Sequence, residues 1–225
     1  TIGPLVIQPA RRDNTGYNPD SFDYICGTYD VPLMTLVPEI SPYKNYAALV
    51  AAAKAATGRF SYGSSGVGTV LHITALQQWQ HHGVEALHVP YKSTGDMVVP
   101  LRTGEVAVFN ETPPVAIQHQ LRPLVVLTDA RVAGFESVPS ARELGLPVRG
   151  SVWGGLVAPK GLPAALRDQL QSACKAATDT TVYKARAQAA NSPLVWRDGE
   201  NFRRFAQSEF DKMRQIVNDN GLRER

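Results

Sequence analysis

The sequence lacks the features of a membrane-spanning or metal-binding protein. Among its 225 residues no apolar run reaches about 18 residues, the length that a transmembrane helix needs. Only two cysteines occur, Cys26 and Cys174, with no CxxC pair and no histidine at ligand spacing near either. His81 and His82 would point about 100° apart on a helix, and His72 is too distant to complete an i, i+4 pair. We expect no metal and no cofactor, and the spacing leaves open whether the two cysteines pair.

A strong excess of one charge is also absent. The chain has 23 basic and 20 acidic residues, and the resulting net charge of +3 is too small and too scattered to indicate a nucleic-acid partner. The basic residues of 202–217 alternate with acidic ones, as on a solvated helix face. Residues 1–14 lack the basic start and long apolar middle of a signal peptide. With 44% hydrophobic residues, the chain can bury one large core or two small ones.

Residues 61–79, SYGSSGVGTVLHITALQQW, combine glycines and serines with an apolar run at helical spacing. This pattern predicts a loop followed by a helix that begins near Thr69. A helix start behind small residues offers unpaired N–H groups and the positive end of the helix dipole to an anion. An ordinary strand-to-helix turn also favours glycine and serine, so the pattern alone does not require a ligand.

Three familiar motifs do not fit this loop. A P-loop ends in Gly-Lys-Ser/Thr, whereas this loop ends in Gly68-Thr69 without a lysine. The dinucleotide motif GxGxxG has a different spacing from Gly63, Gly66 and Gly68, and no acidic ribose partner is evident. A serine-hydrolase elbow needs a glycine at position 67, which is valine. The two serines are therefore interpreted as hydroxyl donors.

Strand and helix patterns alternate along the first two thirds of the chain, which predicts an α/β fold with a mainly parallel sheet covered on both faces. After residue 157 the sequence becomes mostly helical, with a last helix over about 200–219. The predicted strands are 33–37, the segment before the glycine-rich loop, 85–91, 105–110 and 121–129. The predicted helices are 43–57, 70–79, 94–104 with an interruption at Pro100, and 112–120.

Three predicted strands are followed by small or hydroxylic residues. These are the glycine-rich loop, residues 91–95 (YKSTG) and residues 110–113 (NETP). Ligands of such sheets bind beyond the carboxyl ends of the strands. We expect the three loops to meet in one polar cleft.

A series of motifs resembles the Bug-type solute receptors of tripartite tricarboxylate transporters, and the likeness extends over essentially the whole chain. No single motif decides it, but their order and spacing do. They are Tyr62–Gly68 followed by Leu71-His72, His88–Lys92, Val138–Ser140 with Glu143–Pro147, and Trp153–Pro163.

The resemblance implies a two-lobed fold like that of type II periplasmic binding proteins, with a ligand between the lobes. Residues 1–37 and 151–225 would form the first lobe, and residues 38–150 the second. Members of this family normally begin with a signal peptide and further residues of the first lobe, so that lobe would be incomplete in this chain. The resemblance further implies a periplasmic receptor, without enzyme activity, that delivers a small carboxylate to membrane transporter subunits.

The resemblance also implies which residues bind the ligand. Ser64, Ser65, Gly66, Gly68 and Thr69 match the loop that holds a carboxylate through backbone amides and hydroxyls.

Five more residues are candidates. His72 follows one helical turn later, where packing inside the lobe is the alternative role. Tyr91 and Lys92 match a Tyr-Lys step, although Lys92 could also be merely solvated. Asn110 and Glu111 depart from the family pattern, and Glu111 could pair with a ligand amine or cap the next helix.

Two other functions stay open at this level. An enzyme could use the glycine-rich loop for a phosphorylated or acyl substrate, with His72 as the only candidate base. A ligand-sensing regulator could share the two-lobed fold, although no DNA-binding helix-turn-helix is evident.

Overall fold

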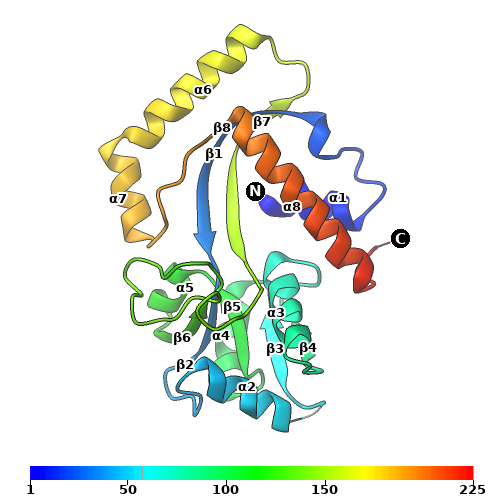
Figure 1. Cartoon of the computed structure of the whole chain (residues 1–225), viewed down its shortest axis with the longest axis vertical. Coiled ribbons are helices and arrows are strands. Elements are labelled where there is room, and N and C mark those ends of the chain that lie inside the picture. The colour runs from blue at the N-terminus through cyan, green and yellow to red at the C-terminus, as the bar shows by residue number, and fades with distance from the viewer. Residues whose placement is uncertain (57, 225) are drawn as a thin grey trace. The chain divides into compact units, whose positions relative to one another are not determined.

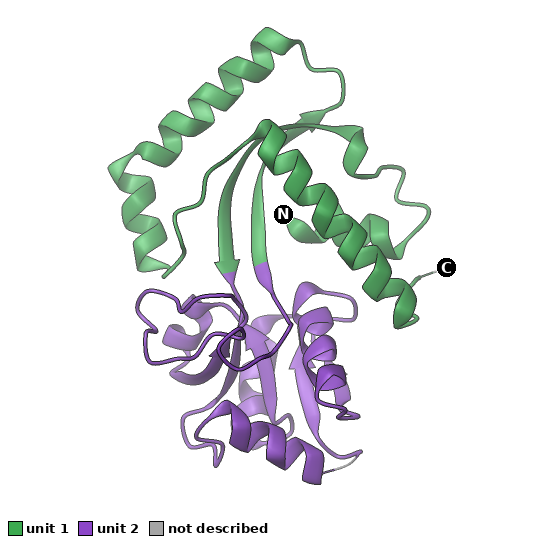
Figure 2. Ribbon diagram, viewed as in Figure 1, with its two compact units in different colours: residues 1–31, 152–225 green, residues 32–151 purple. Residues whose placement is uncertain are grey.

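The computed structural model describes residues 1–56 and 58–224, which fold into two compact units (Figure 2). The first unit comprises Thr1–Val31 and Val152–Arg225, and the second comprises Pro32–Ser151. Residues 32–37 and Ser151, which were predicted to belong to the first lobe, lie in the second unit. The reason is that β2 (Met34–Pro38) pairs with two strands of that unit. Within the described residues, no helix is both long and apolar enough to span a membrane.

The first unit is built on a three-stranded sheet in the order β7-β1-β8. Strand β1 pairs antiparallel with the short β8, and a single π-helical turn and several helices surround the sheet (Figure 1). The strands are β1 (Phe22–Pro32), β7 (Ser151–Pro159) and β8 (Arg197–Asp198). The helices are η1 (Gly3–Ile7), α1 (Gln8–Arg11), η2 (Pro19–Ser21), α6 (Ala164–Asp179), α7 (Thr181–Ala189) and α8 (Gly199–Asp219).

Aromatic side chains fill the core of the first unit. The ring of Phe202 on α8 packs edge-on against Tyr24 and Trp153, with centroid distances of 5.3 and 5.9 Å. A disulfide bond joins Cys26 on β1 to Cys174 on α6, which resolves a pairing that the sequence spacing left open. Because Thr178 is the one buried residue of α6, the disulfide attaches a mostly exposed helix to β1.

The second unit contains a five-stranded sheet in the order β4-β3-β5-β2-β6. Helix α3 packs against β3 and β5, and α4 packs against β3 and β2. The remaining strands are β3 (Ser61–Ser64), β4 (Leu87–Pro90), β5 (Val108–Glu111) and β6 (Leu121–Val126). The helices are α2 (Tyr46–Ala55), α3 (Val70–His81), α4 (Thr94–Thr103) and α5 (Pro113–Gln118).

Two expectations about this unit need correction. Strand β3 is parallel to β4 and β5, but β2 is antiparallel to β5 and β6, so the sheet is mixed rather than mainly parallel. Alternation of strands and helices indicates parallel pairs but says nothing about a strand inserted from elsewhere in the chain. Helix α4 also continues through Pro100 and ends at Gly104, whose φ of 80° provides a left-handed cap.

Candidate functional site

The carboxyl ends of β3, β4 and β5 lie side by side, as predicted from the three strand-end loops. Ser64 pairs with Pro90 on β4, and Gly63 pairs with Phe109 on β5, which places Asn110 next to the end of β3. The loops that follow these strands are therefore neighbours at one edge of the sheet. We call this edge, with its loops, the strand-end rim.

The loop over residues 64–69 is fixed by hydrogen bonds to one carbonyl oxygen. The hydroxyls of Ser64 and Thr69 both donate to the carbonyl of Gly66, over 3.0 and 2.9 Å. Thr69 also caps α3, because its Oγ1 accepts the N–H of His72. Gly66 and Gly68 have φ values of 120° and 72°, which residues with a Cβ rarely adopt. The loop thus has a defined conformation.

The donors of this loop are not equally available. The N–H of Gly66 donates to Ser64 Oγ over 3.3 Å, and the N–H of Gly68 donates to His72 Nδ1 over 3.0 Å. Ser65 is half-buried, and within the described residues neither its amide nor its hydroxyl makes a hydrogen bond. Of the loop residues predicted to bind a ligand, Ser65 is therefore the most available donor.

A cluster of three aromatic rings lies next to the loop. His72 is buried and its ring stacks on that of His88, with 3.9 Å between the centroids and an angle of 25° between the planes, while Tyr62 lies 5.1 Å from His88 and 6.2 Å from His72. His88 Nε2 lies 2.6 Å from the hydroxyl oxygen of Ser64. Burial lowers the pKa of His88 to about 4, so this ring is neutral at pH 7.

Sequence reasoning did not select His88, although it stands at the start of the HVPYK motif that was recognised. Its partner Ser64 precedes it by 24 positions, and only the pairing of β3 with β4 brings the two together.

Tyr91 and Lys92 follow β4 directly. The N–H of Tyr91 donates to the carbonyl of Ser64 over 2.8 Å, so this residue lies against the glycine-rich loop. Its hydroxyl donates to Glu105, and burial together with that carboxylate raises the pKa of Tyr91 to about 12. Lys92 is exposed and forms no ion pair within the described part of the chain, which makes it an available cation near the rim.

Asn110 belongs to a buried polar network. Its amide donates to Gln78 Oε1 over 2.6 Å, and the Gln78 amide donates to Thr35 and to the hydroxyl of Tyr46 over 2.8 and 3.2 Å. Asn110, Gln78 and Thr35 are each at most 1% exposed. The Asn110 amide thus ties β5 to α3, and contact with a ligand stays a prediction for this residue.

Glu111 uses both carboxylate oxygens within the second unit. Oε1 accepts the hydroxyl of Thr94 over 2.5 Å, and Oε2 accepts the N–H of Thr112 over 2.7 Å. Thr94 is the first residue of α4 and Thr112 is the N-cap of α5. Glu111 thus contacts the N-cap residue of α5 and the start of α4, but α5 has no side-chain cap hydrogen bond, so the two roles considered from the sequence stay predictions.

A family model described as "Tripartite tricarboxylate transporter family receptor" matches residues 3–222. The chain belongs to this receptor family. A Cupriavidus necator protein, "UPF0065 protein in gbd 5'region", is 32% identical over 203 residues, which are 89% of this chain and 62% of that protein. The protein BugT of Bordetella pertussis is 28% identical, over 86% of this chain and 61% of its own length. This chain thus spans less than two thirds of the length of either relative.

Several solved structures, among them a periplasmic binding protein of the Bug type, have the same fold as this chain. The periplasmic binding protein BugD superposes with a TM-score of 0.84 at 21% identity, covering 99% of this chain and 77% of BugD. A Rhodopseudomonas palustris protein with adipate gives 0.85 at 22% identity, over 97% and 75% of the chains. MatC from Rhodopseudomonas palustris, with bound malate, gives 0.79 at 22% identity, over 96% and 76%. The likeness to Bug-type receptors and the α/β binding-protein fold are confirmed.

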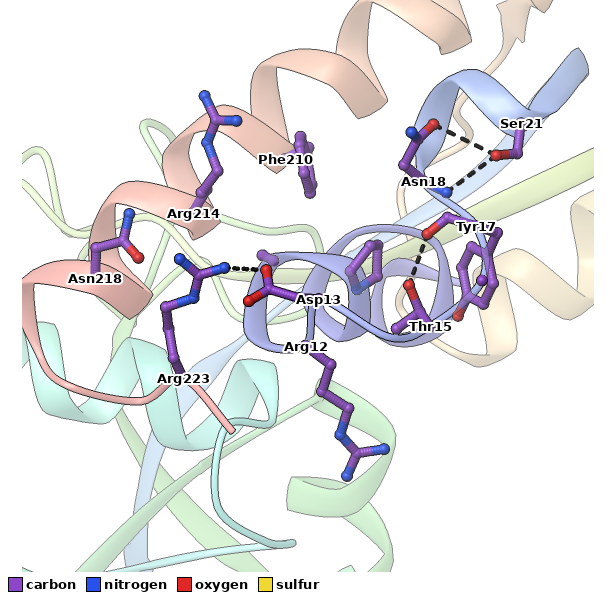
Figure 3. A pocket seen from close by; sticks show the side chains of 13 residues that line it. Arg12, Asp13, Thr15, Tyr17, Asn18, Ser21, Phe210, Arg214, Asn218 and Arg223 are labelled. Carbon is purple, nitrogen blue, oxygen red and sulfur yellow. Dashed lines mark hydrogen bonds and ion pairs between the residues drawn. The ribbon is translucent and has the colours of Figure 1, made fainter. Parts of the chain in front are cut away.

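The first unit of this receptor chain contains a separate cleft of about 720 Å³ (Figure 3). It is lined by the segment around residues 9–21 and by α8, and three arginines take part in it. Arg223 points to Asp13 and forms an ion pair with it, while Arg12 pairs with Glu224. Since these cations already have carboxylate partners, the cleft has a weaker case for an anionic ligand than the strand-end rim.

Proposed function

We propose that this receptor chain captures a small carboxylate at the strand-end rim of its second unit and delivers it, in the periplasm, to the membrane subunits of a tripartite transporter. The observation that supports this most is the loop over residues 64–69. Its own hydrogen bonds hold it in one conformation in front of α3, and it leaves the donors of Ser65 available. A receptor gains affinity from such a loop because binding then costs less conformational entropy.

The rim offers three kinds of attraction to a carboxylate. The amide and hydroxyl of Ser65 can each donate a charge-assisted hydrogen bond, worth about 1.5–3 kcal/mol. The N-terminus of α3 adds about 0.3–1 kcal/mol through its dipole. Lys92 supplies a mobile positive charge that attracts the anion from a distance and is screened by salt.

The ligands of two structural neighbours support a carboxylate as the ligand that we propose. One of these neighbours contains adipate and another malate, and both ligands are short aliphatic dicarboxylates. The neighbour BugD is a periplasmic binding protein, which supports the location that we propose. A ligand with one carboxylate at the rim and a second polar group further along fits this comparison.

The geometry favours binding over catalysis. An enzyme would need an accessible nucleophile beside a base. Ser64 and His88 have the required separation of 2.6 Å, but Ser64 is fully buried and its hydroxyl is bonded to the Gly66 carbonyl. The Nδ1 of His72, the base considered from the sequence, already accepts the N–H of Gly68.

Native mass spectrometry of protein purified without refolding tests the proposal directly, since a retained small acid would identify the ligand. Calorimetric titration with malate, adipate, succinate and the uncharged diamide of adipic acid then measures the affinity. We expect binding of at least one acid and none of the diamide.

Two single-residue variants locate the site. Replacing Lys92 with glutamine should weaken carboxylate binding several-fold at low salt and less at high salt. Lys184 on α7, which is also exposed, provides the matched control, and Lys184→Gln should leave the affinity unchanged. Absence of any retained acid together with no heat of binding for every acid of the panel would refute the proposal.

A further inference from the structure

His88 has no assigned part in carboxylate capture, yet it makes the shortest side-chain contact with the loop. We propose that His88 is a positioning residue: its Nε2–H holds the Ser64 hydroxyl, which in turn fixes the Gly66 carbonyl and the conformation of the ligand-binding loop. The inference rests on the proposed function and deepens it, because it explains how the loop keeps its donors in place.

The positions of the protons follow from counting donors and acceptors. Ser64 Oγ has one hydrogen and two lone pairs. Its hydrogen goes to the Gly66 carbonyl at 3.0 Å, and one lone pair accepts the Gly66 N–H at 3.3 Å. The second lone pair is then left for His88, so the imidazole Nε2 is the donor over 2.6 Å.

This assignment gives a directed series of hydrogen bonds. It runs from the ring of His88 through the Ser64 hydroxyl to the Gly66 carbonyl, where the hydroxyl of Thr69 donates as well. If the proton of His88 were on Nδ1 instead, the Ser64 hydroxyl would have to donate to the ring. The Gly66 carbonyl would then lose one of its two hydroxyl donors, and the loop would be held less firmly.

The surrounding rings hold His88 in this orientation. Its imidazole stacks on His72 at 3.9 Å and on Tyr62 at 5.1 Å, and these two rings lie 6.2 Å from each other. His72 has the same tautomer by the same reasoning, since its Nδ1 accepts the Gly68 N–H and its proton must be on Nε2. Each histidine thus holds one end of the loop, His88 through Ser64 and His72 through Gly68.

Two substitutions separate the hydrogen bond from the ring packing. Phenylalanine at position 88 keeps an aromatic ring against His72 and Tyr62 but cannot donate, whereas glutamine loses the ring and provides an amide donor near the position of Nε2. We expect His88→Phe to weaken adipate or malate binding at least tenfold, and His88→Gln to restore it to within about threefold of the parent. His81→Phe, an exposed histidine at the far end of α3, should bind as the parent does.

A double-variant cycle links the effect to Ser64. If His88 acts through the Ser64 hydroxyl, Ser64→Ala combined with His88→Phe should bind no more weakly than the weaker of the two single variants. Independent, multiplying losses would overturn the proposal. So would parental binding by His88→Phe together with a tenfold loss in His88→Gln, which would indicate ring packing alone.

Imidazole and amide 15N spectra of the ligand-free protein provide a test that does not depend on ligand identity. We expect the Nε2–H tautomer for His88 and His72, and shifted amide signals of Ser65 and Gly66 in His88→Phe that return in His88→Gln. Unchanged loop signals in His88→Phe, or an Nδ1–H tautomer of His88, would overturn the positioning role. If the parent protein bound no carboxylate, the proposed function would fail, and these spectra would still decide the role of His88.

Discussion

Replacing Gly66 with alanine tests whether the conformation of the loop determines its function. Gly66 has a φ of 120°, a value that residues with a Cβ rarely adopt. Space is not the obstacle, because the nearest atoms to an added Cβ are Thr69 Cγ2 at 3.7 Å and the carbonyl oxygen of Tyr91 at 4.0 Å. The substitution therefore introduces backbone strain with little steric overlap.

The expected loss can be worked out in two ways. A residue held in a sparsely populated backbone region costs about 1–3 kcal/mol. If the loop relaxes instead, the Gly66 carbonyl loses the hydroxyls of Ser64 and Thr69, and each such bond contributes about 0.5–1.5 kcal/mol. Both routes lead to a similar penalty, which appears either in the free energy of unfolding or as about 5- to 100-fold weaker carboxylate binding.

Urea unfolding and calorimetric titration with adipate and malate measure the two quantities on the same samples. Gly3→Ala is the matched control, since Gly3 lies in the first unit at the start of η1, has no positive φ and would have no atom within 4 Å of an added Cβ. It should keep its affinity and be as stable as the parent or slightly more so. A Gly66→Ala protein with parental stability and parental affinity would refute the reasoning about the loop.

Two further predictions concern covalent and proton linkage. Removing the disulfide by Cys26→Ala and Cys174→Ala should lower the free energy of unfolding by about 2–5 kcal/mol, because the bond closes a loop with a sequence separation of 148. Hydrogen exchange should increase first in α6. Equal stability of the parent protein with and without reductant would contradict this prediction. Burial lowers the pKa of His88 from 6.5 to about 4, so the unfolded chain binds more protons between these values. The contribution of His88 to the free energy of unfolding, about 1–3 kcal/mol, is complete above pH 6.5 and decreases as the pH falls toward 4. His88→Phe should therefore reduce the slope of the unfolding free energy against pH in this window. Parallel pH profiles for both proteins would contradict a neutral His88 ring.

Local patterns in the sequence determined much of the second unit. The change from small residues to a 3.6-residue apolar period identified β3, its loop and α3, and Thr69 was placed correctly as the start of the helix. The order of short motifs along the chain identified the receptor family before any contact was known. These features are predictable because turn chemistry, capping and amphipathic periodicity depend on residues a few positions apart.

Only the tertiary structure decided which distant residues meet. It inserted β2 antiparallel between β5 and β6, joined Cys26 to Cys174, and brought His88 to Ser64. It also brought Glu111 to Thr94, 17 positions earlier in the chain. Periodicity shows which face of an element is buried but not which element covers it, since partners that are distant in sequence are selected by the packing of the whole unit.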